Sequence, residues 1–325
     1  MKIKDIVNLT AGELLSNPTI DAIKFTTLYL SKVSLGSLFI SNSNQEIQEA
    51  VAKGAYAIIF SNEYIEIFDR EVAWIKVDNI KSATIKIIRY LLIEKDTTLY
   101  LLNSLEFSLL DLILLKKIKI ELISGEWKSV CEKILNSKNQ ILVGTDSYIF
   151  NRIKPDINRL FGSVELNILH RSFLKTTFKF ENIVYFEKDI TPFHLIYLQR
   201  VLHFCKENCL SFNLEKLKYT KHFTPVYIDR FLNISRASES DRVVIFIDTI
   251  KEIERAKEYL KEFSPWARYI VLAPLEIGVD FNNIIRYRDK NEAQSILKSY
   301  LYNYAFVYGL DKSILNRKRR EFLLF

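Results

Sequence analysis

Short apolar runs alternate with segments of helical periodicity along most of this chain. Near the N-terminus, residues 37–41 and 55–60 are typical of buried strands, and residues 44–53 between them carry apolar side chains at helical spacing. A third apolar run at 73–77 precedes a helical pattern at 82–92. This order predicts a βαβ unit that continues into a further strand and helix.

The middle of the chain repeats this alternation and then changes character. Apolar runs at 98–102, 118–123 and 141–143 predict strands, and helical patterns at 105–116 and 128–137 separate them. These elements predict a second small open sheet.

Beyond residue 160 the chain first becomes strand-rich and then alternates again. Residues 164–188 are strand-like and rich in Phe, Val and Tyr, and residues 192–208 have a helical pattern. The C-terminal part predicts a βαβ-type domain. Its elements are expected at 243–248, 250–263, 269–273, 283–287 and 292–302.

These patterns place the chain in the α/β class, with several small open-sheet domains. Its 325 residues are about twice the ~150 residues of a typical domain. We expect an N-terminal α/β domain over 1–95, a reduced middle α/β region over 96–235 with a β-rich second half, and a Rossmann-like C-terminal domain over 236–325.

The composition, with 49% hydrophobic and 26% charged residues, is that of an ordinary globular protein. The most apolar window, 98–115, is interrupted by Asn103, Glu106 and Asp111, which are costly in lipid, so we expect no membrane helix. The polar start of the chain has no continuous apolar stretch behind it, so we expect no secretory signal. These features predict a soluble cytoplasmic protein.

The cysteines and histidines do not form a metal motif. Cys131, Cys205 and Cys209 contain no Cys-x-x-Cys pair, and the four scattered histidines do not complete a zinc ligand set. We therefore expect reduced, structural thiols and no metal. No histidine has a Ser or Cys nucleophile at a recognisable motif spacing, so we expect surface or half-buried roles for all four.

Charge gives little support for nucleic-acid binding. The net charge of +7 arises from 46 basic and 39 acidic residues mixed along the chain. One basic run, residues 317–320, is a candidate contact for an anionic surface, and its alternative interpretation is a solvated C-terminal helix.

The glycines exclude a nucleotide phosphate loop. Such a loop uses clustered glycines so that backbone N–H groups can close on phosphate, followed by Lys and Ser or Thr. The eight glycines form no such cluster, and Lys175-Thr176-Thr177 lies in a β-like pattern that predicts a strand with alternating exposure. We therefore expect no ATP and no other cofactor.

Two stretches, 26–40 and 49–59, carry a family resemblance. Gly36–Phe39 matches a Gly-x-Leu-Phe strand, and Ala50–Ala57 matches an Ala-x-x-x-Gly-Ala-x-Ala strand entry. They resemble the N-terminal domain of the Mur ligases, ATP-dependent enzymes that build the peptide stem of peptidoglycan precursors. The nearest branch is MurF, which adds D-alanyl-D-alanine.

A second resemblance lies near the C-terminus. Residues 268–278 are similar to a Val-Leu-Gly-x-Met-x-Glu-Leu-Gly strand of the same family. The family also has an Asp-x-Tyr-Asn motif at a strand end, and only Asp248 matches it here. The resemblance implies Mur-ligase-like N- and C-terminal domains around the reduced middle region. It also implies that the unit from Ser37 to Phe60 forms a sheet with four buried apolar residues: Leu38, Ile40, Ala57 and Ile59.

The binding parts of the family pattern are absent. Tyr29, Leu30 and Ser31 stand where the family has the Asp-Ser/Thr-Arg turn that contacts the UDP-sugar, and the loop after Phe39 is shortened to residues 41–44. Without these polar groups we expect no tight binding of UDP-N-acetylmuramoyl peptides.

Strand-end residues supply the candidate ligand-binding positions, because open α/β sheets bind ligands at the carboxyl ends of their strands. The alternative for residues 145–147 is a turn in which an Asp or Ser side chain caps the next helix. The candidates are Thr145, Asp146, Ser147, Asp248, Ser41 and Asn42; we expect no catalytic residue among them.

Three functions are compatible with these observations. The first is a non-catalytic, MurF-related protein that binds a cell-wall synthesis protein or a peptidoglycan precursor. The second is an enzyme of another kind that uses Thr145, Asp146 and Asp248 in a cleft between α/β domains. The third is binding to nucleic acid or an anionic surface through residues 317–320, which a steep loss of affinity with salt would reveal.

Overall fold

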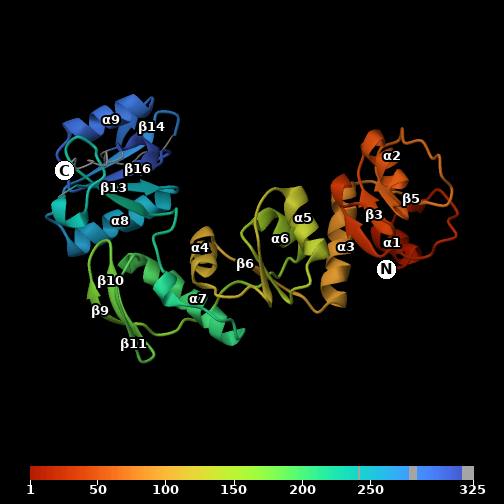
Figure 1. Ribbon diagram of the computed structural model, residues 1–325, viewed down its shortest axis with the longest axis horizontal. Helices are drawn as coiled ribbons and strands as arrows, with labels where there is room; N and C mark the ends of the chain where they lie inside the picture. The colour runs from red at the N-terminus through yellow and green to blue at the C-terminus, as the bar shows by residue number, and fades with distance from the viewer. Residues whose placement is uncertain (241, 278–283, 317–325) are drawn as a thin grey trace, which may run out of the picture. The chain divides into compact units, whose positions relative to one another are not determined.

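The computed structural model describes residues 1–240, 242–277 and 284–316. The chain divides into two compact units: unit 1 comprises Met1–Phe107 and Lys116–Phe161, and unit 2 comprises Ser108–Leu115 and Gly162–Phe325. Both units are built from small open sheets covered by helices, so the predicted α/β class is confirmed (Figure 1). The boundaries of the three expected domains stay a prediction.

The first sheet of unit 1 confirms the predicted βαβ unit. Its order is β1-β5-β4-β3-β2, with β2 to β5 parallel and β1 antiparallel at the edge. Leu38, Ile40, Ala57 and Ile59 are at most 2% exposed. The elements are α1 Ile3–Thr10, β1 Glu13–Leu14, β2 Phe25–Thr27, β3 Ser37–Ile40, α2 Asn44–Ala52, β4 Ala57–Phe60, β5 Ala73–Lys76 and α3 Ile80–Glu94.

The second sheet of unit 1 is parallel, with the order β6-β8-β7. The three predicted strands and both predicted helices of this region are present. The elements are β6 Thr98–Leu101, α4 Ser104–Ile113, β7 Ile120–Ile123, α5 Trp127–Asn136, β8 Ile141–Gly144 and α6 Ser147–Ile153. Helix α4 begins in unit 1 and continues into unit 2.

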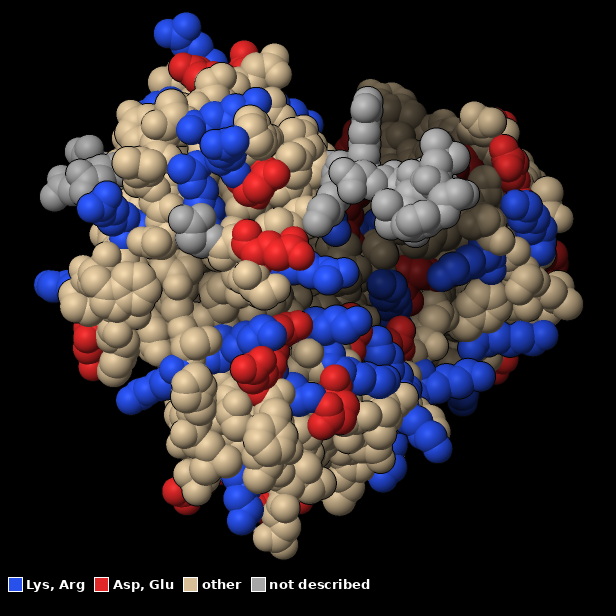
Figure 2. Space-filling view, turned by 60° about the vertical axis from the view of Figure 1, so that its left-hand side comes forward, with Lys and Arg blue, Asp and Glu red and all other residues tan. Residues whose placement is uncertain are grey.

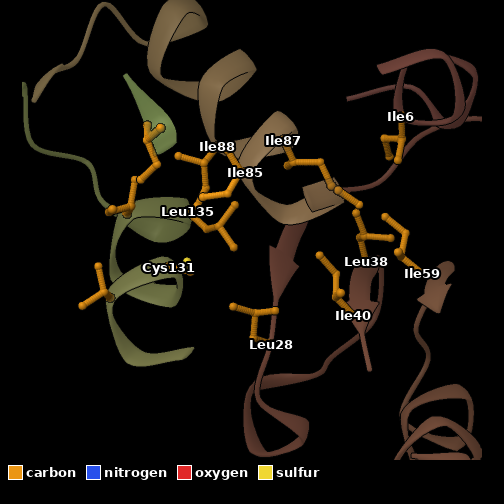
Figure 3. Packing of buried hydrophobic residues seen from close by; sticks show 14 of the residues in the cluster. Ile6, Leu28, Leu38, Ile40, Ile59, Ile85, Ile87, Ile88, Cys131 and Leu135 are labelled. Carbon is orange, nitrogen blue, oxygen red and sulfur yellow. The ribbon is translucent and has the colours of Figure 1, made fainter. Parts of the chain in front are cut away.

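One apolar core holds the two sheets of unit 1 together. Helix α3 is apolar on two sides: Ile87 points toward Leu38 of the first sheet, whereas Ile85 and Ile88 point toward Leu135 of α5 (Figure 3). All five side chains are buried. Burial of apolar surface on both sides of α3 therefore joins the N-terminal sheet to the second sheet.

Unit 2 opens with an antiparallel sheet of order β11-β10-β9, where strand-like segments are predicted. Lys175-Thr176-Thr177 enters β10, but the predicted alternation of exposure is wrong, since Thr176 and Thr177 are both buried. Both hydroxyls have partners in the fold, which permits their burial: Thr176 donates to the Ile190 carbonyl, and Thr177 accepts from the Glu187 amide. The elements are β9 Asn167–Arg171, β10 Thr176–Phe180, β11 Ile183–Lys188 and α7 Leu195–Glu207.

The last sheet of unit 2 has the order β12-β13-β16-β14-β15, parallel except for β12. The pattern predicts a helix to residue 302, but α9 ends at Ser299. The apolar residues at 304–308 form a further strand, β16, which pairs with β13 and β14. The elements are β12 Thr224–Ile228, β13 Arg242–Ile247, α8 Ile250–Phe263, β14 Tyr269–Pro274, β15 Ile284–Tyr287, α9 Lys290–Ser299 and β16 Tyr304–Tyr308.

Short 3-10 helices complete the described elements: η1 Leu30–Lys32, η2 Pro192–His194, η3 Leu214–Lys216, η4 Ala237–Glu239 and η5 Lys312–Ile314. Among the helices that the structure describes, none is long and apolar enough to cross a membrane. The basic run at 317–320 lies outside the described residues.

Candidate functional site

Phosphate-binding loops join a strand to the N-terminus of a helix, where free backbone N–H groups and the helix dipole attract the anion. The parallel sheet β6-β8-β7 has three strand-to-helix turns, before α4, α5 and α6. They contain Leu-Asn at 102–103, Ser-Gly-Glu at 124–126 and Thr-Asp at 145–146. None of these three turns contains the clustered glycines and the lysine of a phosphate loop.

The turn before α4 is closed by Glu106. The Asn103 amide donates to Glu106 Oε2 at 3.2 Å, and the Glu106 amide donates to Asn103 Oδ1 at 2.8 Å. This is the reciprocal arrangement of a capping box, and Glu106 is only 5% exposed. A carboxylate therefore occupies the helix end that would otherwise receive a phosphate, and its negative charge opposes an anion there.

Replacement of Glu106 by alanine is expected to lower the free energy of unfolding of unit 1 by about 1 kcal/mol, the usual value of a lost cap. Replacement by glutamine should lower it less, because the amide oxygen still accepts from the Asn103 N–H. Denaturant titration followed by Trp127 fluorescence measures both variants. Equal stability of the alanine variant and the unsubstituted chain would contradict the capping role.

The turn before α6 holds three of the predicted site residues. Asp146 caps α6 by accepting from the Ile149 amide at 2.9 Å, as the turn interpretation predicts. Thr145 is half-buried and Ser147 is exposed at the first position of the helix. Gly144, which precedes them, lies against the ring of Phe150, so closely that a Cβ atom there would overlap the ring. Ligand binding by this turn stays a prediction.

Ser41 and Asn42 lie in the turn between β3 and α2. The Ser41 hydroxyl donates to Glu46 Oε2 at 2.6 Å, and the Asn42 amide group donates to Ser61 Oγ at 3.0 Å. The Ser61 backbone N–H in turn donates to Asn42 Oδ1 at 2.8 Å. These polar groups stabilise the loop, and their use toward a ligand also stays a prediction.

The turn over residues 27–32 is anchored by a buried carboxylate. Glu132 of α5, 1% exposed, accepts from the Leu28 amide at 2.8 Å and from the Thr27 hydroxyl at 3.0 Å. Lys32 pairs with the same carboxylate at 3.2 Å. Residues 27–32 therefore act as a joint between the N-terminal sheet and α5, a role that no local sequence pattern indicates.

In unit 2 the structure brings together three polar side chains that are distant in the sequence. His222 Nδ1 lies 2.8 Å and 2.7 Å from the two carboxylate oxygens of Asp248. His222 Nε2 lies 3.2 Å from Ser108 Oγ. Asp248 follows β13 directly, His222 lies two residues before β12, and Ser108 is in α4.

The carboxylate determines which imidazole nitrogen carries the proton. Because an ionised carboxylate only accepts hydrogen bonds, the Nδ1–H of His222 donates to Asp248. Nε2 is then left with a lone pair directed at the Ser108 hydroxyl. The ring is buried, with its side chain 3% exposed, whereas Asp248 is 34% exposed. Asp248, one of the predicted site residues, is thus joined to a histidine and through it to a serine.

The remaining histidines and the cysteines vary in their surroundings. His194 is buried and bonded through Nε2 to Glu252 at 2.6 Å, so the prediction of surface or half-buried roles is wrong for His194 and His222.

Burial raises the pKa of the Cys131 and Cys205 thiols to about 12. Among the residues that the structure describes, no three His, Cys, Asp or Glu side chains are grouped to hold a metal ion.

Acidic and basic side chains share the surface. On the face shown in Figure 2, Lys and Arg are interspersed with Asp and Glu rather than gathered into a field of one sign. Binding to a polyanion such as nucleic acid draws on a concentrated basic surface. This face does not favour that function.

Comparison with known proteins places this geometry in a structural class. No family model and no curated protein matches the sequence. The fold, however, is that of the Mur ligases. The MurF ligase from Thermotoga maritima in complex with ADP superposes with a TM-score of 0.54 at 14% identity, over 90% of this chain and 95% of that chain. MurF from Acinetobacter baumannii superposes with a TM-score of 0.52 at 11% identity, over 94% and 95% of the two chains.

Proposed function

We propose that this chain is a Mur-ligase-fold protein that does not perform ATP-driven ligation and that acts by binding, in connection with peptidoglycan precursor synthesis. The observation that carries the proposal is the carboxylate of Glu106 at the N-terminus of α4, hydrogen-bonded to the Asn103 amide. It occupies the type of position at which a strand-to-helix turn would bind phosphate.

Electrostatics supports the absence of nucleotide chemistry. The carboxylates of Glu106 and Asp146 accept backbone N–H groups at two of the three helix N-termini beside the sheet β6-β8-β7. The polyphosphate of a nucleotide is strongly anionic and gains affinity from free N–H groups and lysine, whereas these helix ends already hold an acceptor. The Thermotoga maritima structure is a complex with ADP, which makes that protein a positive control for nucleotide binding.

Calorimetric titration with Mg-ADP and Mg-ATP is expected to give no saturable heat at millimolar nucleotide, and no phosphate release from ATP is expected. The Thermotoga maritima MurF ligase, titrated with Mg-ADP under the same conditions, serves as the control. Saturable binding of either nucleotide to this chain, or its hydrolysis of ATP at an enzyme-like rate, would overturn the proposal.

The binding partner is expected to be a protein of cell-wall synthesis rather than a free UDP-linked precursor. The turn at 27–32 uses its polar groups to hold Glu132, and Ser41 and Asn42 are bonded within their own loop. A pull-down from the native organism, followed by titration of this chain with each purified cell-wall enzyme recovered, tests the proposal. Recovery of no such enzyme, or micromolar binding of a UDP-muramoyl peptide, would contradict this choice of partner.

A further inference from the structure

We propose that Ser108 is an activated nucleophile that accepts acyl groups from small carboxylic esters, with His222 as its general base and Asp248 as the residue that positions the imidazole. This inference goes beyond the binding role proposed above and does not rest on it. All three residues belong to unit 2, and the reaction uses no nucleotide.

The connectivity is that of a serine nucleophile, base and acid. Ser108 Oγ lies 3.2 Å from His222 Nε2, which is within reach for proton transfer. His222 Nδ1 lies 2.7 Å from the nearer Asp248 oxygen. The carboxylate therefore holds the tautomer that leaves Nε2 basic, and it stabilises the imidazolium that forms when Nε2 takes a proton.

Burial favours the same roles. The imidazole of His222 is almost completely removed from water, which strengthens its interaction with the carboxylate. Ser108 is half-buried, so its hydroxyl remains within reach of a small reagent. Ser108 and His222 are 114 residues apart, and His222 and Asp248 are 26 apart, so the geometry does not arise from a local turn or cap.

The reaction balances without any further group. Ser108 Oγ bonds to the carbonyl carbon of the ester while its proton passes to His222 Nε2. The bond from that carbon to the alkoxy oxygen then breaks, and the proton on Nε2 leaves with the alcohol. Water attacks the acyl carbon and gives a proton to Nε2, the bond to Oγ breaks, and Oγ recovers that proton. The net change is ester and water to carboxylic acid and alcohol.

The position of Ser108 limits the substrate to esters. It lies within α4, where backbone N–H groups bond to carbonyls of the preceding turn, so the amide next to the nucleophile is not free to bind an oxyanion. Removal of one such donor lowers kcat roughly 10²–10³-fold in serine hydrolases. Esters with good leaving groups tolerate this loss better than amides, because their carbonyl carbon is the more electrophilic and the departing alkoxide needs less assistance.

The test is covalent labelling of the full chain with a fluorophosphonate, followed by peptide mass spectrometry, together with hydrolysis of p-nitrophenyl acetate. We expect label on Ser108, with loss of both labelling and hydrolysis in Ser108→Ala. Ser104→Ala, the same change in the same helix at an exposed position, is the matched control and should behave as the unsubstituted chain. An unlabelled Ser108 in folded protein, or label on Ser104 instead, would overturn the proposal.

Two further variants separate catalysis from a purely structural linkage. His222→Gln and Asp248→Asn should each slow labelling of Ser108 by at least ~100-fold, the lower range for a general base. The far-downfield proton resonance of the His222 Nδ1–H should be visible in the unsubstituted chain and lost in Asp248→Asn. Labelling at the original rate in a folded His222→Gln variant would exclude the base role. Alanine favours helix, so the Ser108→Ala variant should fold. Its labelling result therefore tests the proposal even if the buried His222 cannot be replaced.

Discussion

Replacement of Glu132 by alanine is expected to lower the free energy of unfolding of unit 1 by about 3 kcal/mol, because each buried donor left without an acceptor costs about 1–3 kcal/mol. Glu132 is 1% exposed and accepts from the Leu28 amide and the Thr27 hydroxyl while pairing with Lys32. Its loss leaves buried donors without an acceptor, and each such group is costly.

Denaturant titration followed by the fluorescence of Trp74 and Trp127, which both belong to unit 1, measures this change. Lys32→Ala is the matched control: Lys32 is 56% exposed, and without it Glu132 still accepts from the Thr27 hydroxyl and the Leu28 amide, so this change should cost less than about 1 kcal/mol. Glu132→Gln should fall between the two, because it keeps an acceptor oxygen. If Glu132→Ala and Lys32→Ala were equally mild, residues 27–32 would not be a joint held by Glu132.

Replacement of Gly144 by alanine is expected to destabilise unit 1 by about 2 kcal/mol, as overpacking of a close-packed core does. The added Cβ would overlap the ring of Phe150, which is fully buried and has little room to move. This glycine is the last residue of β8, the central strand of its sheet, and at the carboxyl end of such a strand glycine could also serve close approach to a ligand. The ring contact assigns it to packing instead.

A double variant, Gly144→Ala with Phe150→Leu, tests that assignment. If the clash is the cause, the smaller side chain relieves part of it, and the two substitutions together should destabilise less than their sum. Thr145→Ala, a half-buried neighbour in the same turn, should change stability by no more than about 0.5 kcal/mol. Full additivity of the Gly144 and Phe150 substitutions would show that they do not interact.

The chain shares a fold with the Mur ligases, and its own side chains close several of its turns. The Mur ligase fold is retained over both units. Several of its helix N-termini and turns hold hydrogen-bonded side chains of the chain itself, including Glu106, Asp146 and Asn42. Core packing depends on apolar size and pattern, whereas ligand binding depends on individual polar groups. A few polar substitutions can therefore remove binding while the scaffold persists.

Local patterns by themselves determined most of the strands and helices. The continuous apolar runs that contain Leu38, Ile40, Ala57 and Ile59 predict buried strands, and the structure buries both faces of β3 and β4. The absence of a phosphate loop was also evident in the sequence, because that motif is contiguous and each of its residues has a separate task. Asp146 was recognisable as a helix cap for the same reason, since a cap acts within one turn.

Only the tertiary structure decided which distant groups meet. Glu132 contacts Thr27 across 105 residues, and Ser108 meets His222 across 114, with no periodicity or spacing to indicate either pair. Strand β16 is a further case: the apolar run at 304–308 has the local pattern of any short strand, and its place between β13 and β14 depends on pairing with both. Hydrogen bonds between distant segments leave no local sequence signal, because each partner only has to be polar and correctly placed once the chain has folded.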